Sequence, residues 1–259
     1  MNFPIFNDAN ETPLERLLPD GGFSAIFRSV ACVGDSLSSG EFEEKRDGQT
    51  FWHDRYDYSW GQFMARATGA KVYNFSRGGM TAKIYCETFA QEQGFWDQEK
   101  ACQAYILALG VNDLMGDKQE IGSTEDICLS DYTKNKKTFA GYLGEIVQRL
   151  KEISPRAFFF FMTMPRSDDG DEKDGIRRAH AKLMYEFADY FSNSFVIDFY
   201  KYAPVYDADF REIYYLENHM NACGYYLTAK MTMTYIDYII RHNVSAFRKV
   251  GMFAPRENP

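Results

Sequence analysis

A serine that follows a short apolar segment is the first candidate for chemistry in this 259-residue chain. Residues 30–33 are Val-Ala-Cys-Val, Gly34 ends the run, and Ser36 follows two residues later. In an open α/β sheet, ligands bind at the carboxyl ends of the strands, so a hydroxyl here would face the usual crevice. If Ser36 also begins a helix, free backbone N–H groups and the helix dipole would stabilise its alkoxide. The alternative is a serine that only caps a helix.

Three further polar blocks follow in order along the chain. Residues 74–79 are Asn-Phe-Ser-Arg-Gly-Gly, residues 110–113 are Gly-Val-Asn-Asp, and residues 219–225 are His-Met-Asn-Ala-Cys-Gly-Tyr. Together with the Gly-Asp-Ser-Leu of residues 34–37, these blocks resemble the SGNH, or GDSL, family of hydrolases. One such block alone is a weak signal, whereas four in this order are specific. The resemblance extends over roughly residues 28–242.

The resemblance implies a role for one residue or more in each block. A serine hydroxyl is a poor nucleophile without a base, and acyl transfer needs donors aimed at the developing oxyanion. The family pattern implies Ser36 as the nucleophile and His219 as the base. It also implies an oxyanion hole formed by the backbone N–H groups of Ser36 and Gly79 and the side-chain amide of Asn112. Taken singly, Asn112 fits a turn residue and Gly79 a plain loop glycine.

The chain has four histidines, and three of them are expected at positions without a catalytic role. His53 lies in a long polar segment, where a surface position is expected. His180 falls on the buried stripe of a predicted helix, and His242 ends a helix, where a cation is favoured. His219 alone lies in a loop that leads into the final helix, which matches the position of the family's base.

The triad acid is the one part of the family pattern that this chain lacks. The family usually has an aspartate three residues before the histidine, and that position is Leu216 here. We therefore expect a Ser-His dyad or a triad with a relocated acid, in which Glu217 or a backbone carbonyl of residues 198–217 orients His219. A backbone carbonyl can hold a neutral imidazole in this way. Four more carboxylates are expected near the same end of the sheet: Asp198, Asp207, Asp209 and Glu212.

Two further aspartates and two acidic clusters are expected to have no part in the chemistry. Asp35 and Asp113 are expected to hydrogen-bond nearby loop backbone and so hold their blocks in shape. The acidic clusters at residues 113–126 and 168–174 are interpreted as solvated loops rather than metal sites. No metal and no cofactor is expected.

Apolar segments with strand and helix patterns alternate along the chain. Strands are predicted near residues 30–34, 71–75, 101–109, 157–162 and 194–199. Helices are predicted near residues 60–68, 131–152, 173–191 and 222–241. This alternation predicts an α/β fold, a single-domain three-layer sandwich whose five-stranded parallel sheet is covered on both faces. The alternation does not give the strand order; the resemblance implies the flavodoxin-like order 2-1-3-4-5. The hydrolase domain is predicted at residues 28–242, after an N-terminal arm (1–27) and before a C-terminal tail (243–259).

Residues 40–58 are predicted to be a long polar connection that leaves the same strand end as Ser36. Connections of this length in compact domains are usually functional or disordered, and the aromatic residues here favour an ordered one. Trp52 and Tyr58 are therefore candidates for substrate binding, by stacking on a sugar ring or lining an acyl pocket. The alternative is that these aromatic side chains form the small core of the loop itself.

Composition excludes several classes of protein. The formal net charge is −8, and nothing in the chain supplies the basic stripe that a nucleic-acid partner requires. No apolar run approaches membrane-spanning length, and the N-terminus lacks the basic and apolar regions of a signal peptide. The five cysteines are odd in number and lack metal-ligand spacing, so free thiols and a cytoplasmic location are expected.

These observations predict a serine esterase that hydrolyses small O-acyl esters through an acyl-enzyme on Ser36. An O-acetyl group, carried by a carbohydrate, is the favoured substrate, on family analogy and the aromatic residues. The alternatives are a short-chain acyl esterase, a thioesterase or a lysophospholipase, or a catalytically silent binding module of the same fold. The expected partner is a small-molecule ester, and the oligomeric state is not predicted.

Overall fold

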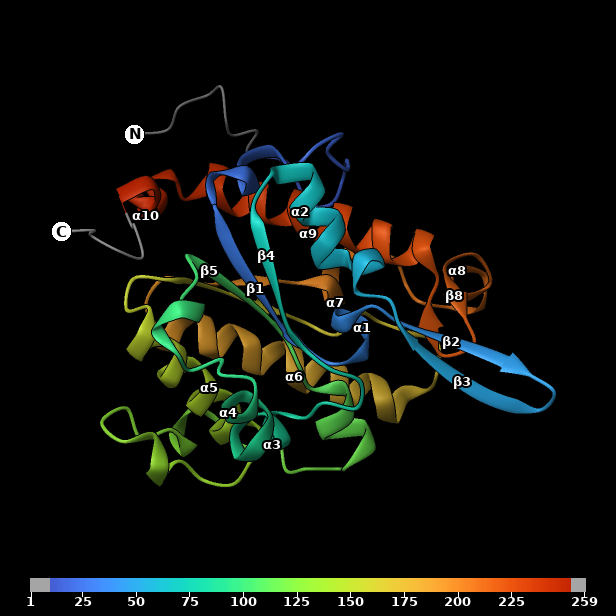
Figure 1. The fold of residues 1–259 in the computed structure, drawn as a ribbon, viewed down its shortest axis with the longest axis horizontal. Coiled ribbons are helices and arrows are strands. Elements are labelled where there is room, and N and C mark those ends of the chain that lie inside the picture. Colours follow the sequence, from blue (N-terminus) through green and yellow to red (C-terminus); the bar gives the residue numbers. More distant parts are fainter. Residues whose placement is uncertain (1–9, 253–259) are drawn as a thin grey trace.

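A computed structural model describes residues 10–252 of the chain. A five-stranded parallel sheet of order β4-β1-β5-β6-β7 runs through its centre (Figure 1). The strands of this sheet are β1 (Ser29–Gly34), β4 (Lys71–Ser76), β5 (Ala104–Ala108), β6 (Phe158–Met162) and β7 (Ser194–Ile197). Counted along the chain within the sheet, this is the order 2-1-3-4-5. The predicted fold class and strand order are confirmed.

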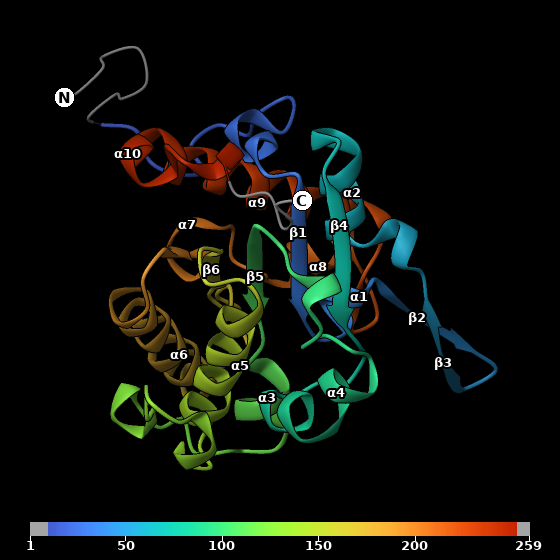
Figure 2. The same ribbon diagram turned by 60° about the vertical axis from the view of Figure 1, so that its left-hand side comes forward.

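Helices cover both faces of the sheet and give the three layers (Figures 1 and 2). One face packs against α2 (Trp60–Thr68) and α9 (Ala222–His242), and the other against α5 (Phe139–Ile153) and α6 (Asp171–Tyr190). Side chains of β1 alternate between the two cores, with Cys32 on the α2 and α9 side and Val33 on the other. A strand buried on both faces needs an apolar residue at every position, which explains its continuous apolar sequence.

The described part of the chain also has six short α-helices, two small hairpins and several short 3₁₀- and π-helical segments. The helices are α1 (Ser36–Ser39), α3 (Ala82–Ile84), α4 (Ala90–Glu92), α7 (Phe199–Tyr202), α8 (Ala208–Tyr214) and α10 (Val244–Phe247). One hairpin pairs β2 (Glu41–Arg46) with β3 (Gln49–Asp54), and the other pairs β8 (Tyr215–Leu216) with β9 (His219–Met220). The β2–β3 hairpin extends outward from the body of the protein beside β8 (Figure 1).

The expectation of a loop across residues 40–58 is wrong, because most of this segment is the β2–β3 hairpin. Its strands pair in register from Glu41–Asp54 to Arg46–Gln49. Asp47 and Gly48 form the turn, with φ values of +53° and +75°. Asp-Gly is a strong signal for a two-residue hairpin turn, but the charged residues of β2 hide the apolar alternation that usually accompanies it.

One helix also differs from the sequence-based expectation. The helix predicted from residue 131 begins at Phe139, because Thr138 caps it by accepting a hydrogen bond from the Gly141 N–H. Parts of the predicted arm and tail, residues 1–9 and 253–259, lie outside the described residues. The described part of the arm lies against α9, where the Leu18 N–H donates to the Thr234 hydroxyl. Across residues 10–252, no helix combines the length and the apolar character needed to cross a bilayer.

Candidate active site

Ser36 begins α1 at the carboxyl end of β1, an inner strand of the sheet. Gly34 ends the strand, and the Asp35 carboxylate caps α1 by accepting a hydrogen bond from the Leu37 N–H at 3.0 Å. A Cβ at position 34 would overlap the Ser38 side chain, so only glycine lets α1 turn this tightly against β1. The structure therefore places Ser36 at the strand end that the sequence suggests.

The loops after β4 and β5 lie beside Ser36, because these two strands flank β1. Gly79 has a φ of +69°, a left-handed conformation that glycine adopts without strain. Asn112 begins the turn after β5, and its Nδ2 donates to the Met80 carbonyl at 3.1 Å. An amide nitrogen carries two hydrogens, so the second can donate to a substrate. Ser36, Gly79 and Asn112 thus share one edge of the sheet.

Asp35 and Asp113 are buried and hold these loops in place. The Asp113 Oδ1 accepts a hydrogen bond from the Ala82 N–H at 2.7 Å, which ties the loop after β5 to the loop after β4. Burial raises the pKa of Asp113 to about 7 and the pKa of Asp35 to about 6. The expectation that both aspartates bond loop backbone is confirmed.

His219 lies in β9, and its Nδ1 faces the carboxylate of Glu43 on β2. The distance from Nδ1 to the Glu43 Oε2 is 3.0 Å. Asn218 adds two hydrogen bonds to the same carboxylate at 3.2 Å each, one from its backbone N–H and one from its side-chain amide. Glu43 is only 4% exposed. Burial by itself would raise the pKa of Glu43, but the hydrogen bonds from His219 and Asn218 outweigh it and lower the pKa.

The expectation that Glu217 or a main-chain carbonyl orients His219 is wrong. Glu217 forms an ion pair with Lys45 near the surface instead. Leu216, at the family's usual acid position, pairs directly with His219 across the two-residue turn of the β8–β9 hairpin. The acidic group on the Nδ1 comes from Glu43, which sequence reasoning missed.

The other nitrogen of His219 faces a second carboxylate of β2. The Nε2 lies 3.2 Å from the Glu41 Oε1. Glu41 and Glu43 are two residues apart on one strand, so both side chains leave the same face of the hairpin. The Glu41 carboxylate also lies against Gly78, where an added Cβ would overlap its Oε2. Within residues 10–252, no hydrogen bond joins the Ser36 Oγ to His219.

Sequence comparison assigns the family. Residues 32–227 match the profile of the GDSL-like Lipase/Acylhydrolase family, a range that contains all four blocks. The chain belongs to this family. Its members are ester hydrolases. A comparison with curated protein sequences gave no match.

Solved structures with the same fold are only distantly similar in sequence. A family two carbohydrate esterase from Clostridium thermocellum, solved in complex with cellohexaose, is 16% identical with a TM-score of 0.58, covering 85% of this chain and 65% of that chain. A family 3 carbohydrate esterase from the same organism is 14% identical with a TM-score of 0.53, covering 83% and 97%. The lipase/acylhydrolase from Enterococcus faecalis is 15% identical with a TM-score of 0.50, covering 89% and 100%.

The three other histidines of this GDSL-like acylhydrolase lie away from Ser36. His53 pairs with Glu44 at 2.9 Å, on the face of the hairpin opposite to that of Glu43. His180 is fully buried in α6, where its Nε2 bonds the Leu109 carbonyl at 3.1 Å and burial lowers its pKa to about 4. His242 lies at the end of α9 and bonds the carbonyl one turn earlier.

Trp52 and Tyr58 occupy different sides of the hairpin. Trp52 pairs directly opposite Glu43, so the two side chains leave the same face, and Trp52 is 62% exposed. The ring of Tyr58 packs at 5.9 Å from Phe42, a residue whose side chain leaves β2 on the other face. Tyr58 also contacts Phe63 of α2, which fits the alternative of a small aromatic core.

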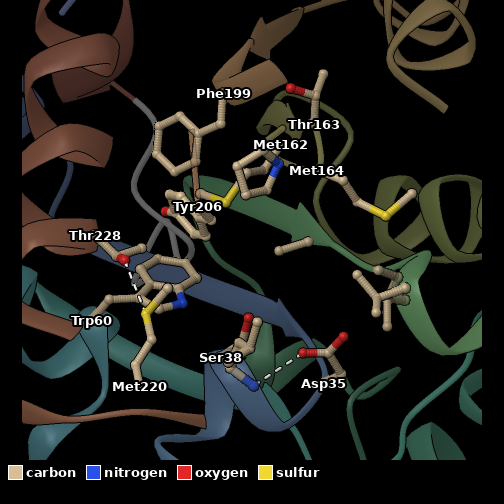
Figure 3. Close-up of a pocket in the computed structure, with 15 residues that line it drawn as sticks. Asp35, Ser38, Trp60, Met162, Thr163, Met164, Phe199, Tyr206, Met220 and Thr228 are labelled. Carbon is tan, nitrogen blue, oxygen red and sulfur yellow. Dashed lines mark hydrogen bonds between the residues drawn. The ribbon is translucent and has the colours of Figure 1, made fainter. Parts of the chain in front are cut away.

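An apolar cavity of about 70 Å³ lies beneath α1 (Figure 3). Both neighbours of Ser36, Asp35 and Leu37, line it, and so does Met220, the neighbour of His219. Figure 3 shows Asp35 and Ser38 on one side of this cavity, with Phe199 and Met162 across from them. The volume is small beside the roughly 300 Å³ at which pockets for drug-sized ligands begin. Between residues 10 and 252, no group of three His, Cys, Asp or Glu side chains is arranged to hold a metal ion.

Proposed function

We propose that this chain is a serine esterase with Ser36 as nucleophile, His219 as base and Glu43 as the acid that orients His219. The buried contact between the Glu43 carboxylate and the His219 Nδ1 carries this proposal. A carboxylate in this place fixes the tautomer with hydrogen on Nδ1 and stabilises the imidazolium that forms during acyl transfer. The acid has moved to a different element, and its chemical role is kept.

In the proposed reaction, the Ser36 Oγ attacks the ester carbonyl and gives its proton to the His219 Nε2. The Ser36 and Gly79 N–H groups and the Asn112 amide stabilise the oxyanion. The Nε2 then protonates the leaving alcohol, and a water molecule hydrolyses the acyl-enzyme by the same steps. The contact between Nε2 and Glu41 must be exchanged for one with the Ser36 Oγ, since catalytic hydrogen bonds often form only in the substrate complex.

The proposed substrate is a short O-acyl ester, with an O-acetyl group on a carbohydrate as the favoured case. The small volume of the cavity that Asp35 and Leu37, the chain neighbours of Ser36, help to line supports a short acyl group. The exposed ring of Trp52, on the same face of the hairpin as Glu43, supports a sugar on the alcohol side. The carbohydrate esterases among the structural neighbours agree with this choice.

Labelling with a serine-directed fluorophosphonate tests the proposal. The intact mass of the wild-type protein should increase by one adduct, and Ser36→Ala should stay unmodified. The Ser39→Ala variant, with its serine at the other end of α1, is the matched control and should still be labelled. A wild-type protein that forms no adduct would support the catalytically silent binding module instead. Labelling that persists in Ser36→Ala would show that Ser36 is not the nucleophile.

A further inference from the structure

The position of Glu41 bears on which alcohols can leave the site, given the proposed function. The His219 Nε2 is the nitrogen that must protonate the leaving oxygen, and it now lies 3.2 Å from the Glu41 Oε1. A leaving oxygen therefore has to enter the space beside this carboxylate. As the ester C–O bond breaks, the proton passes from Nε2 to that oxygen while the Ser36 Oγ keeps the acyl group.

Contacts with Gly78 and Tyr225 fix the position of Glu41. Gly78 shows no left-handed backbone conformation, so its φ alone does not require glycine. A Cβ there would overlap the Glu41 carboxylate, which accounts for the glycine. The Tyr225 hydroxyl donates to the Glu41 carbonyl and fixes the start of β2 from α9. The Glu41 side chain is still 19% exposed, so a substrate can reach it.

The groups that face Glu41 make this side of the site negative. Asp54 pairs directly opposite Glu41 on β3, and Glu43 lies two residues along β2. Burial raises the pKa of Glu41, His219 opposes this, and the charges of Asp54 and Glu43 raise the pKa further. The Glu41 carboxylate faces the His219 Nε2, which carries a positive charge only when the imidazole is protonated. The nearby Lys45 is paired with Glu217.

We infer that Glu41 is a specificity-determining residue that selects the charge of the leaving alcohol. Its carboxylate disfavours alcohols that carry a negative charge and favours neutral, hydroxyl-rich or cationic ones. Like charges across a binding site suppress the wrong partner, whereas opposite charges or hydroxyl donors are attracted to a carboxylate. The inference rests on the proposed function and adds the alcohol side of the substrate to it.

Three para-substituted phenyl acetates test this inference: one with a carboxylate, one with its methyl ester and one with a trimethylammonium group. Each kcat/KM is divided by the rate constant for hydroxide hydrolysis of the same ester, which removes differences in leaving-group reactivity. The wild-type enzyme should prefer the cation over the anion at low ionic strength. Glu41→Gln should reduce that preference on the order of tenfold, the effect of one close charge.

Glu44→Gln is the matched control. Glu44 also lies on β2, three residues after Glu41, but its side chain leaves the opposite face, where it pairs with His53. The Glu44→Gln substitution removes the same charge from the same strand, and the preference for the cationic over the anionic ester should stay as in the wild type. Glu41→Asp, which keeps the charge, should also keep the sign of the preference.

Each outcome separates the inference from the proposed function. Wild-type turnover with no preference, or with a preference for the anionic ester, overturns the inference whatever the variants do. An equal loss of preference in Glu41→Gln and Glu44→Gln also overturns it, because the effect would then be one of net charge. No turnover of any ester, together with no fluorophosphonate adduct on Ser36, overturns the proposed function and the inference with it.

Discussion

Ser36, Gly79 and Asn112 each lie in a segment that follows a strand of the central sheet. The two carboxylates around His219 come instead from a hairpin that extends from the body. The sheet edge uses buried carboxyl groups, such as Asp113, to hold backbone in place, and burial raises their pKa. The hairpin carries Glu43, whose hydrogen bonds lower its pKa and keep it charged. The sheet therefore supplies the geometry of the candidate site, and the hairpin supplies its charge.

The largest expected effect follows from removing the charge that the hairpin supplies. Glu43→Gln should lower kcat on p-nitrophenyl acetate by up to roughly 10⁴-fold, the cost of losing a triad acid. The matched control is Glu217→Gln, whose carboxylate pairs with exposed Lys45 and should matter less than about threefold. A larger loss of kcat in Glu217→Gln than in Glu43→Gln would show that Glu217, and not Glu43, acts as the acid.

The next effect belongs to the sheet edge. Asn112→Ala should lower kcat by about 10²–10³-fold with little change in KM, because an oxyanion donor acts mainly in the transition state. Steady-state kinetics on p-nitrophenyl acetate measures this. A wild-type kcat in the variant would show that Asn112 is not an oxyanion donor. The backbone N–H groups of Ser36 and Gly79 would then be the donors.

A smaller effect distinguishes the two faces of the hairpin. Trp52→Ala should raise KM for an O-acetylated oligosaccharide by about three- to tenfold, since an aromatic contact contributes roughly 0.5–1.5 kcal/mol. KM for p-nitrophenyl acetate should change little. Tyr58→Ala is the control, because Tyr58 packs with Phe42 on the other face. Equal KM effects in both variants would show that the rings act by packing alone.

The smallest effect concerns stability at the sheet edge. The folded-state pKa of Asp113, about 7, lies above its unfolded value. The contribution of Asp113 to the free energy of unfolding is therefore largest at low pH and is lost as the pH rises through 7. Asp113→Asn cannot ionise and should gain about 1 kcal/mol or more over the wild type at pH 8, by the free energy of one pKa unit. At pH 5 the gain should be smaller. Thermal unfolding of both proteins at the two pH values decides this, and an equal difference at both would contradict it.

The sheet and its edge could be predicted because their signals are local. Each strand is a short apolar run, and the block with its polar residue follows directly, as in the passage from β1 to Ser36. The strand order came only from the family resemblance, since the alternation of strands and helices fits several orders. The predicted order is that of the structure.

The acid could not be predicted, because its position depends on contacts between distant segments. Glu43 and His219 are separated by 176 residues, and no spacing rule connects them. The hairpin that carries Glu43 lacks apolar alternation, so only Asp47-Gly48 marked it. Glu217 is near His219 in sequence, but its carboxylate pairs with Lys45 instead.

A double-mutant cycle between Glu43 and His219 tests whether Glu43 acts through His219. The four proteins are the wild type, Glu43→Gln, His219→Gln and the double variant, compared by kcat/KM on p-nitrophenyl acetate. Residues that act as one catalytic unit are strongly non-additive. Glu43→Gln should therefore cost a large factor when His219 is present and less than about threefold when His219 is already replaced. An equal cost in both backgrounds would show that Glu43 does not act through His219.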